Sequence, residues 1–333
     1  MAKIVRFHEL GGPEVLKIED VPSKEPAKDE VALSVQAIGL NRAESMFMHG
    51  YYVEPTQLPA KLGFEASGII SAVGPNVDES WLNKPVSTIP AFSMNQYGVL
   101  GNEVIVPVHA LGEYPPRLTP IEATSICMQY LTAYGALIEL GRVKEGDFVL
   151  ITAASSSTGL AAIEIVKAEG AISIGTTRNA AKRGELLALG ADHVIVTEEE
   201  DLVARVKEIT SGAGAQTIFD PIAGPLLDKL AEAAAPGAVI FQYGWLSLAQ
   251  TPFPLVPALQ KALTVRGYWL AEITTDAQRL ARAKTYVYER LKSGHLTPKI
   301  AKIFAFEDVV EAYRYMESNE QIGKIVLTIG TKS

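Results

Sequence analysis

The spacing of apolar and polar residues divides the chain into three stretches. Residues 1–124 carry short apolar runs separated by Gly, Pro and Asn, a pattern typical of a compact, barrel-like β domain. From residue 125 to 270, apolar strands alternate with single helices, which predicts a parallel sheet covered on both faces and wound right-handed. The apolar runs on which the β-domain prediction for residues 1–124 rests are KIVRF, EVALSVQAIGL, ASGIISAV and EVIVPV.

The tail of the chain returns to a β-rich pattern. After an amphipathic helix in TTDAQRLARAKTYVYERLKSG come a strand, a second helix over residues 306–318 and a last strand in GKIVLTI. Because this tail follows a completed alternating sheet, we assign residues 1–124 and 271–333 to one domain and residues 125–270 to another. The expected fold class is α/β, with a β-rich domain beside a doubly wound parallel sheet.

Composition narrows the class of protein. The 333 residues carry a net charge of −8, which argues against a general nucleic-acid or anionic-membrane binder. We find neither the apolar core of a secretory signal nor a run long enough to cross a bilayer, so we expect a cytoplasmic protein. A single cysteine, Cys127, excludes an internal disulfide and a multi-cysteine zinc lobe.

A candidate phosphate-binding turn follows the strand FVLIT. On the Gly-x-Gly-x-x-Gly pattern of dinucleotide folds, the three positions are Ala154, Ser156 and Gly159, so one glycine survives. A helix N-terminus at this joint offers free N–H groups and a positive dipole end to an anion, and serine hydroxyls also donate to phosphate. We therefore predict a dinucleotide cradle, with an ordinary N-cap serine cluster as the alternative. Its residues are Ser155, Ser156, Ser157, Thr158 and Gly159.

The end of the next strand indicates which coenzyme binds. NAD-preferring folds place an acid there, whereas this strand ends in ISIGTTRN without one. Thr177, Arg178 and Lys182 together form a receptor for the 2′-phosphate of NADP(H). The alternative is that Arg178 and Lys182 are only solvated helix charges.

Several motifs carry a family resemblance along essentially the whole chain. They are Asn41, Gly50 with Tyr52, the Gly63-Phe64-Glu65 run through Gly68, LTAYGAL, EGDFVLITAA and GKIVLTI. In this order and spacing the chain resembles the zinc-independent quinone oxidoreductase and enoyl reductase branch of the medium-chain dehydrogenase/reductase family. The resemblance implies a GroES-like β-rich domain, a Rossmann NADP(H)-binding domain and a hydride transfer reaction.

The resemblance also implies that no metal is bound. Zinc-dependent relatives have a Cys where this chain has Asn41 and a His where it has Phe64, and only Glu65 is kept. A lone carboxylate does not make a zinc site. The chain departs from its branch at Ser156 and Ser157, which replace a Gly-Gly pair, and at Thr197, which replaces a tyrosine near the 2′-phosphate.

Without a metal, the acceptor must be polarised by its own carbonyl. The resemblance implies a small hydrophobic quinone or α,β-unsaturated carbonyl compound, reduced by NADPH in the cleft between the domains. Asn41 and Tyr52 are the candidate donors to the oxygen that gains negative charge, and Tyr52 is also a candidate proton source. A purely packing role for Tyr52 is left open. Tyr243, Gly244 and Lys324 complete the predicted cofactor contacts.

Other functions stay open at this point. A non-catalytic, crystallin-like NADPH-binding protein and an enoyl-thioester reductase fit the same residues. A methyl-donor-binding transferase is disfavoured by the basic Thr-Thr-Arg stretch. We expect a homodimer, in which the strand in LTVRGYWL extends its sheet across a two-fold axis, as in relatives.

Overall fold

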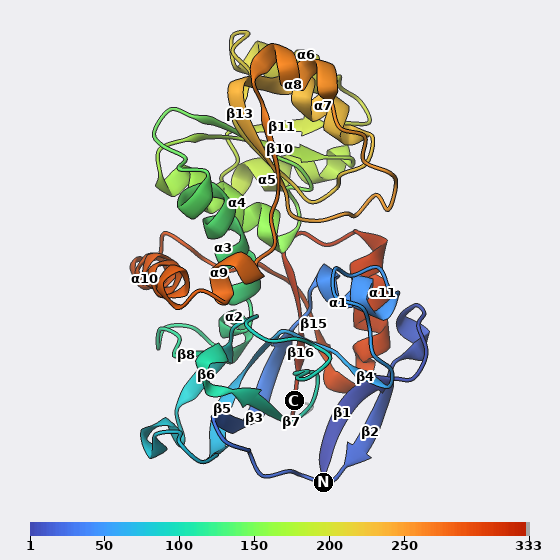
Figure 1. The fold of residues 1–333 in the computed structure, drawn as a ribbon, viewed down its shortest axis with the longest axis vertical. Helices are drawn as coiled ribbons and strands as arrows, with labels where there is room; N and C mark the ends of the chain where they lie inside the picture. Colours follow the sequence, from blue (N-terminus) through green and yellow to red (C-terminus); the bar gives the residue numbers. More distant parts are fainter. Residues whose placement is uncertain (331–333) are drawn as a thin grey trace. The chain divides into compact units, whose positions relative to one another are not determined.

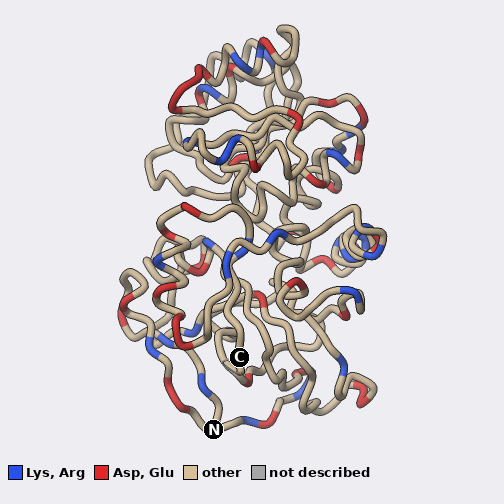
Figure 2. Tube along the Cα trace, turned by 180° about the vertical axis from the view of Figure 1, so that it is seen from behind, with Lys and Arg blue, Asp and Glu red and all other residues tan. Residues whose placement is uncertain are grey.

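The computed structural model describes residues 1–330 and contains two compact units. The first unit comprises Met1–Met128 and the residues from Pro298 onward, and the second comprises Gln129–Thr297. Lys and Arg are interspersed with Asp and Glu along the trace of each unit (Figure 2). No helix among residues 1–330 combines the length and the apolar character that crossing a bilayer requires.

The first unit is built around two sheets. The larger has the strand order β15-β16-β3-β5-β6-β8, with β7 also paired to β3, and the smaller has the order β2-β1-β4 (Figure 1). The strands are β1 (Ala2–Phe7), β2 (Lys17–Val21), β3 (Glu30–Gly39), β4 (Ala60–Lys61), β5 (Glu65–Val73), β6 (Pro85–Thr88), β7 (Glu103–Pro107), β8 (Leu111–Gly112), β15 (Ile300–Ala305) and β16 (Lys324–Thr328).

Short helices connect these strands. They are η1 (Pro13–Val15), α1 (Arg42–Met48), η2 (Glu79–Trp81), η3 (Val108–Ala110), α2 (Pro120–Ala123), η6 (Phe306–Asp308) and α11 (Val309–Ser318). The last strand, β16, pairs antiparallel with β3, with Leu327 opposite Ile38. Residues 298–330 thus lie with the β-rich unit, and the predicted fold class of this unit is confirmed.

The second unit contains one parallel sheet with the order β11-β10-β9-β12-β13-β14. Its strands are β9 (Phe148–Ile151), β10 (Ile172–Thr177), β11 (His193–Val196), β12 (Ala215–Asp220), β13 (Ala234–Gln242) and β14 (Thr264–Gly267). Strands β9, β10 and β11 are buried along nearly their whole length, as expected for strands covered on both faces. The predicted Rossmann topology is confirmed.

Helices cover both faces of this sheet. The chain runs outward from β9 in one direction through β10 and in the other through β12, so right-handed crossovers put the connecting helices on opposite faces. Helices α6, α7 and α8 lie together on one of them (Figure 1). The helices are α3 (Cys127–Tyr134), the π-helix η4 (Gly135–Leu140), α4 (Ser157–Ala168), η5 (Ala180–Lys182), α5 (Arg183–Ala188), α6 (Leu202–Ile209), α7 (Leu226–Ala233), α8 (Leu255–Lys261), α9 (Ala271–Thr274) and α10 (Ala277–Ser293).

The domain boundaries differ from those we predicted at 124/125 and 270/271. Helix α10 belongs by its contacts to the second unit: Arg282 pairs with Glu139, and both Tyr286 and Arg290 bond Glu169, at 2.7 and 2.9 Å. An amphipathic pattern shows that a helix has an apolar face, but it does not say against which sheet that face packs. The segment 271–297 therefore lies with the parallel sheet.

Candidate functional site

The turn between β9 and α4 has the geometry of a helix N-terminus open to an anion. Ser156 is the N-cap, and its hydroxyl oxygen accepts a hydrogen bond from Gly159 N at 3.0 Å. The first-turn N–H groups of α4 point toward the turn, where the positive end of the helix dipole also lies. The N-cap alternative therefore describes Ser156 correctly, and a capped N-terminus remains able to receive a phosphate.

Gly159 allows α4 to approach this turn closely. A Cβ atom at this position would lie 2.7 Å from Ala153 O and 2.7 Å from Ala154 Cα, which real Cβ atoms do not tolerate. This is the close helix–strand packing for which dinucleotide folds keep their third glycine. The surviving glycine of the motif is thus explained by packing.

A buried cation reaches the same turn. Lys182, the last residue of η5, is only 8% exposed, and its ammonium donates a hydrogen bond to Ser155 Oγ at 3.2 Å. Burying an ammonium costs free energy that nearby polar and anionic groups offset. The sequence led us to expect Lys182 at the end of β10; the structure also brings its ammonium to the phosphate turn, a position that fits a pyrophosphate.

The end of β10 presents small and basic side chains. Thr177 is nearly buried, and its hydroxyl accepts a bond from Asn179 N at 3.2 Å. Arg178 follows the strand and is exposed. No acidic residue occupies this strand end, and the contacts of Thr177 and Arg178 with a 2′-phosphate remain predictions.

A buried polar cluster lies at the ends of β12 and β13. Asp220 is fully buried and accepts hydrogen bonds from Thr152 Oγ1, Ala223 N (2.8 Å) and Gln242 Nε2 (2.6 Å). The ring of Tyr243 stacks on Phe219 with centroids 3.9 Å apart. Burial, with the nearby Asp220 carboxylate, raises the pKa of the Tyr243 hydroxyl well above its ordinary value.

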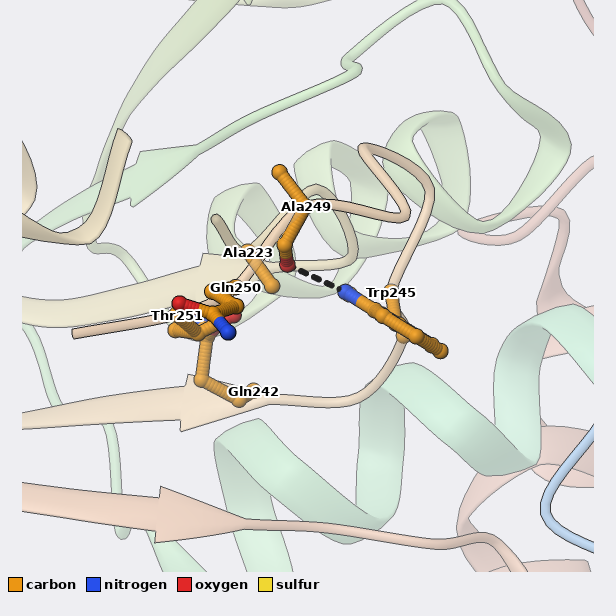
Figure 3. Close-up of a pocket in the computed structure, with 7 residues that line it drawn as sticks. Ala223, Gln242, Trp245, Ala249, Gln250 and Thr251 are labelled. Carbon is orange, nitrogen blue, oxygen red and sulfur yellow. Dashed lines mark hydrogen bonds between the residues drawn. The ribbon is translucent and has the colours of Figure 1, made fainter. Parts of the chain in front are cut away.

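A cavity of about 410 Å³ opens beside this cluster (Figure 3). Its wall is formed by the end of β13 and by the segment that follows, which turns back so that Trp245 Nε1 donates to Ala249 O at 2.7 Å. Gly244, one of the predicted cofactor residues, lines it, whereas Tyr243 points its ring into the protein. The lining residues are Ala223, Gln242, Gly244, Trp245, Ala249, Gln250 and Thr251.

The first unit contains a second buried polar cluster, centred on Asn41. Lys324 Nζ donates to Asn41 Oδ1 at 2.6 Å and forms a fully buried ion pair with Glu65. Glu44 is also buried and accepts bonds from Asn41 N at 2.9 Å and Tyr313 Oη at 2.7 Å. Burial raises the pKa of the Glu44 carboxyl above its ordinary value, and these hydrogen bonds only reduce the size of that shift.

The Asn41 amide is engaged at every atom. Its Nδ2 donates to Gly39 O and to Glu44 Oε1, both at 3.1 Å, while its oxygen accepts from Lys324. Donation to a substrate oxygen therefore requires one of these two bonds to exchange. The predicted catalytic role of Asn41 stays a prediction. Lys324 contacts Asn41, and its predicted contact with the cofactor also stays a prediction.

Tyr52 lies in the aromatic core of the first unit. Its ring contacts Phe47 and Phe64, with centroid distances of 6.2 and 6.3 Å. This agrees with the packing alternative, and proton donation by Tyr52 stays a prediction.

Sequence reasoning missed Glu44, Tyr313, Asp220, Thr152 and Gln242. Two signals were available. Asn41 and Glu44 have the three-residue spacing of a capping box, which is present at the start of α1. Asp220 and Gln242 end two neighbouring parallel strands, and such ends meet at one edge of the sheet. Among residues 1–330, no three His, Cys, Asp or Glu side chains are grouped so that they could hold a metal ion.

Comparison with known proteins identifies the same two parts. Residues 27–153 match the model of the alcohol dehydrogenase GroES-like domain, and residues 157–284 match that of the zinc-binding dehydrogenase domain. The synaptic vesicle membrane protein VAT-1 homolog of Rattus norvegicus is 28% identical, with 96% of this chain and 82% of that protein covered.

Bacterial quinone reductases align over their full length. Quinone oxidoreductase 1 of Escherichia coli (strain K12) is 30% identical, with 98% of this chain and 99% of that protein covered. The crystal structure of Escherichia coli quinone oxidoreductase complexed with NADPH superimposes with a TM-score of 0.90 at 28% identity, covering 98% of this chain and all of that one. The chain therefore belongs to the medium-chain dehydrogenase/reductase family, in its quinone oxidoreductase and enoyl reductase branch.

Proposed function

We propose that this protein is an NADPH-dependent reductase of quinones or α,β-unsaturated carbonyl compounds. The observation that carries the proposal is the phosphate turn, where a buried ammonium, Lys182, bonds Ser155 beside the N-terminus of α4. An anion is the ligand that such a site favours, and the acid-free end of β10 favours the coenzyme with the extra phosphate. The NADPH complex of the Escherichia coli relative supports the same cofactor.

The residues present fit the coenzyme. The pyrophosphate would bind at Ser155–Gly159 and Lys182. The 2′-phosphate would bind at Thr177 and Arg178. Gly244 lines the cavity at the end of β13. When bound, NADPH supplies a hydride to an electron-poor carbon of the acceptor. The protein's part is to bind, orient and exclude water, because positioning contributes most where the cofactor carries the chemistry.

Asn41 and Tyr52 are our candidate donors to the acceptor's oxygen. The Lys324–Glu65 pair and Glu44 fix the Asn41 amide, whose two hydrogens are donated to Gly39 O and to Glu44. The proposed role therefore requires the acceptor's oxygen to replace one of these two partners, and an Asn41 hydrogen would then stabilise the developing negative charge. Tyr52 would supply the proton that completes the reduction.

We further propose that turnover needs no zinc, since Asn41 and Phe64 occupy the positions of the family's zinc ligands. Dialysis against a chelator should leave the NADPH-dependent rate within about two-fold of the untreated rate, a difference too small for a lost catalytic metal. Loss of activity that zinc restores would refute this part of the proposal.

An acceptor panel tests the activity itself. Purified protein should oxidise NADPH, followed at 340 nm, only when a quinone or an α,β-unsaturated ketone or aldehyde is added. Tight NADPH binding without turnover across the panel would instead favour the non-catalytic binding protein. Turnover confined to enoyl thioesters would favour the enoyl reductase alternative.

We also propose a homodimer formed through β14. This strand is the edge of the parallel sheet, and its open backbone can pair with the same strand of a second copy across a two-fold axis. Exposed apolar side chains flank it in the sequence, including Val256 (61%), Leu259 (74%) and Trp269 (52%). Light scattering should give twice the chain mass, and replacing Leu259 with Glu should lower that mass; a monomer for the unmodified protein would contradict the proposal.

A further inference from the structure

Gln242, the last residue of β13, has one hydrogen bond missing. Its Nε2 donates to Asp220 Oδ2 at 2.6 Å, but its Oε1 is buried and accepts no hydrogen bond from residues 1–330. A buried acceptor without a partner is costly, because the water that it lost has not been replaced.

The Asp220 carboxylate determines which atom of the Gln242 amide lacks a hydrogen-bond partner. Its carboxylate already accepts bonds from Thr152 Oγ1 and Ala223 N, and a carboxylate accepts but does not donate. The amide must therefore turn its NH₂ group toward Asp220. The free atom is the oxygen, so the missing partner is an N–H or O–H donor.

Gln242 lines the 410 Å³ cavity, whose other walls include Ala223, Gly244, Trp245 and Ala249 (Figure 3). Two polar groups of that wall already have partners: Trp245 Nε1 donates to Ala249 O, and Thr251 Oγ1 accepts from Gly224 N at 2.9 Å. A flat, largely apolar ring that carries one hydrogen-bond donor fits such a wall.

The sheet order indicates which end of a dinucleotide reaches this cavity. The phosphate turn follows β9, and the predicted 2′-phosphate site lies at β10, on one side of β9. Strands β12 and β13 lie on its other side. A dinucleotide that crosses the switch point between β9 and β12 has its adenosine toward β10 and its nicotinamide toward β13.

We propose that Gln242 Oε1 accepts a hydrogen bond from the carboxamide N–H of the nicotinamide, and that Asp220 and Thr152 are positioning residues for this contact. The inference rests on the proposed NADP(H) function. It assigns the side chain that sets how the nicotinamide ring is turned, and it makes the carboxamide NH₂ a requirement for full affinity.

Binding measurements with a coenzyme analogue test this contact. In 3-acetylpyridine adenine dinucleotide phosphate a methyl group replaces the NH₂, so the donor is lost while the ring and phosphates are kept. Isothermal titration of the full chain should give about ten-fold weaker binding of this analogue than of NADP⁺. Gln242→Met, which keeps the length of the side chain, should weaken NADP⁺ about ten-fold and leave the analogue nearly unchanged.

The ratio of the two dissociation constants is the readout, and Gln242→Leu repeats the test should the methionine variant fold poorly. Gln278→Leu, on the exposed face of α10, is the matched control and should keep the unmodified ratio. If NADP⁺ still binds but the ratio is unchanged in both Gln242 variants, the proposed contact is wrong. Absence of NADP⁺ binding by the unmodified chain would overturn the proposed function as well.

Discussion

At the scale of single residues, Lys324 and Glu65 form a buried ion pair in the first unit. Their side chains are 0% and 1% exposed, and Met128 N adds a second bond to the Glu65 carboxylate at 2.8 Å. A buried pair contributes little net stability when intact, but removing one partner leaves a charge without compensation. The pair also fixes the Asn41 side chain, because the Lys324 ammonium donates to Asn41 Oδ1 as well as to Glu65.

Lys324→Met should therefore lower the free energy of unfolding by about 3–5 kcal/mol, because Glu65 is left buried and unpaired. The double variant Lys324→Met with Glu65→Gln should recover much of that loss, since both charges of the pair are then removed. Urea unfolding followed by circular dichroism measures both. A loss below about 1 kcal/mol in the single variant would contradict the account.

At the scale of elements, α4 connects the phosphate turn to the interior of the second unit. Its N-terminus depends on the Ser156 cap and on the contact of Gly159 with Ala153 and Ala154. Its middle carries Glu164, which accepts a bond from Tyr130 Oη at 2.6 Å and from Thr297 N at 3.2 Å. Helix α4 thus has its N-terminus at the proposed phosphate site and a titratable carboxyl group, Glu164, in its middle.

Gly159→Ala should destabilise the protein by about 1–3 kcal/mol, because the new Cβ must displace backbone. The same displacement moves the turn, so the affinity for NADP⁺ should fall. Gly184→Ala on α5 is the matched control: nothing lies within 4 Å of its Cβ, and alanine should be neutral or stabilise by up to about 1 kcal/mol. Equal melting temperatures for the two variants would contradict the packing argument.

Burial raises the pKa of Glu164 from 4.5 to about 7, against the opposing effect of its hydrogen bonds. The folded state therefore holds the proton more tightly than the unfolded chain. This contribution to stability is complete below about pH 4.5 and is lost as the pH rises through about 7.

Relative to Glu164→Gln, the unmodified protein should lose at most about 3 kcal/mol of unfolding free energy between these two pH values. Unfolding curves of both proteins across that range measure the difference. Parallel pH profiles for the two proteins would show that Glu164 titrates normally.

The sequence predicted the elements with strong periodicity and missed those without it. Strands β9 to β13 and helix α4 were expected, because continuous apolar runs and Gly-marked joints identify them. Helix α8 lies in the Pro-rich stretch TPFPLVPALQ, whose closely spaced prolines do not indicate a helix. The buried cluster of Asn41, Glu44 and Lys324 joins residues 283 positions apart, and no local pattern encodes such a pairing.

At the scale of the whole molecule, the chain divides its chemistry between two units. The second unit holds the phosphate turn, the strand end with Thr177 and Arg178, and the cavity at Gln242. The first unit holds Tyr52, Asn41 and the buried charges around Asn41. In our proposal, the second unit selects the cofactor and the first unit binds the acceptor.

The most direct test of the account is coenzyme preference, measured as kcat/KM for NADPH and NADH with one quinone. We predict a preference for NADPH of about ten-fold or more, since each charge-assisted bond to the 2′-phosphate is worth about 1.5–3 kcal/mol. Arg178→Ala should lower kcat/KM for NADPH alone, while the exposed control Arg314→Ala changes neither. Equal use of NADH and NADPH, or an equal loss with both in Arg178→Ala, would contradict the central claim.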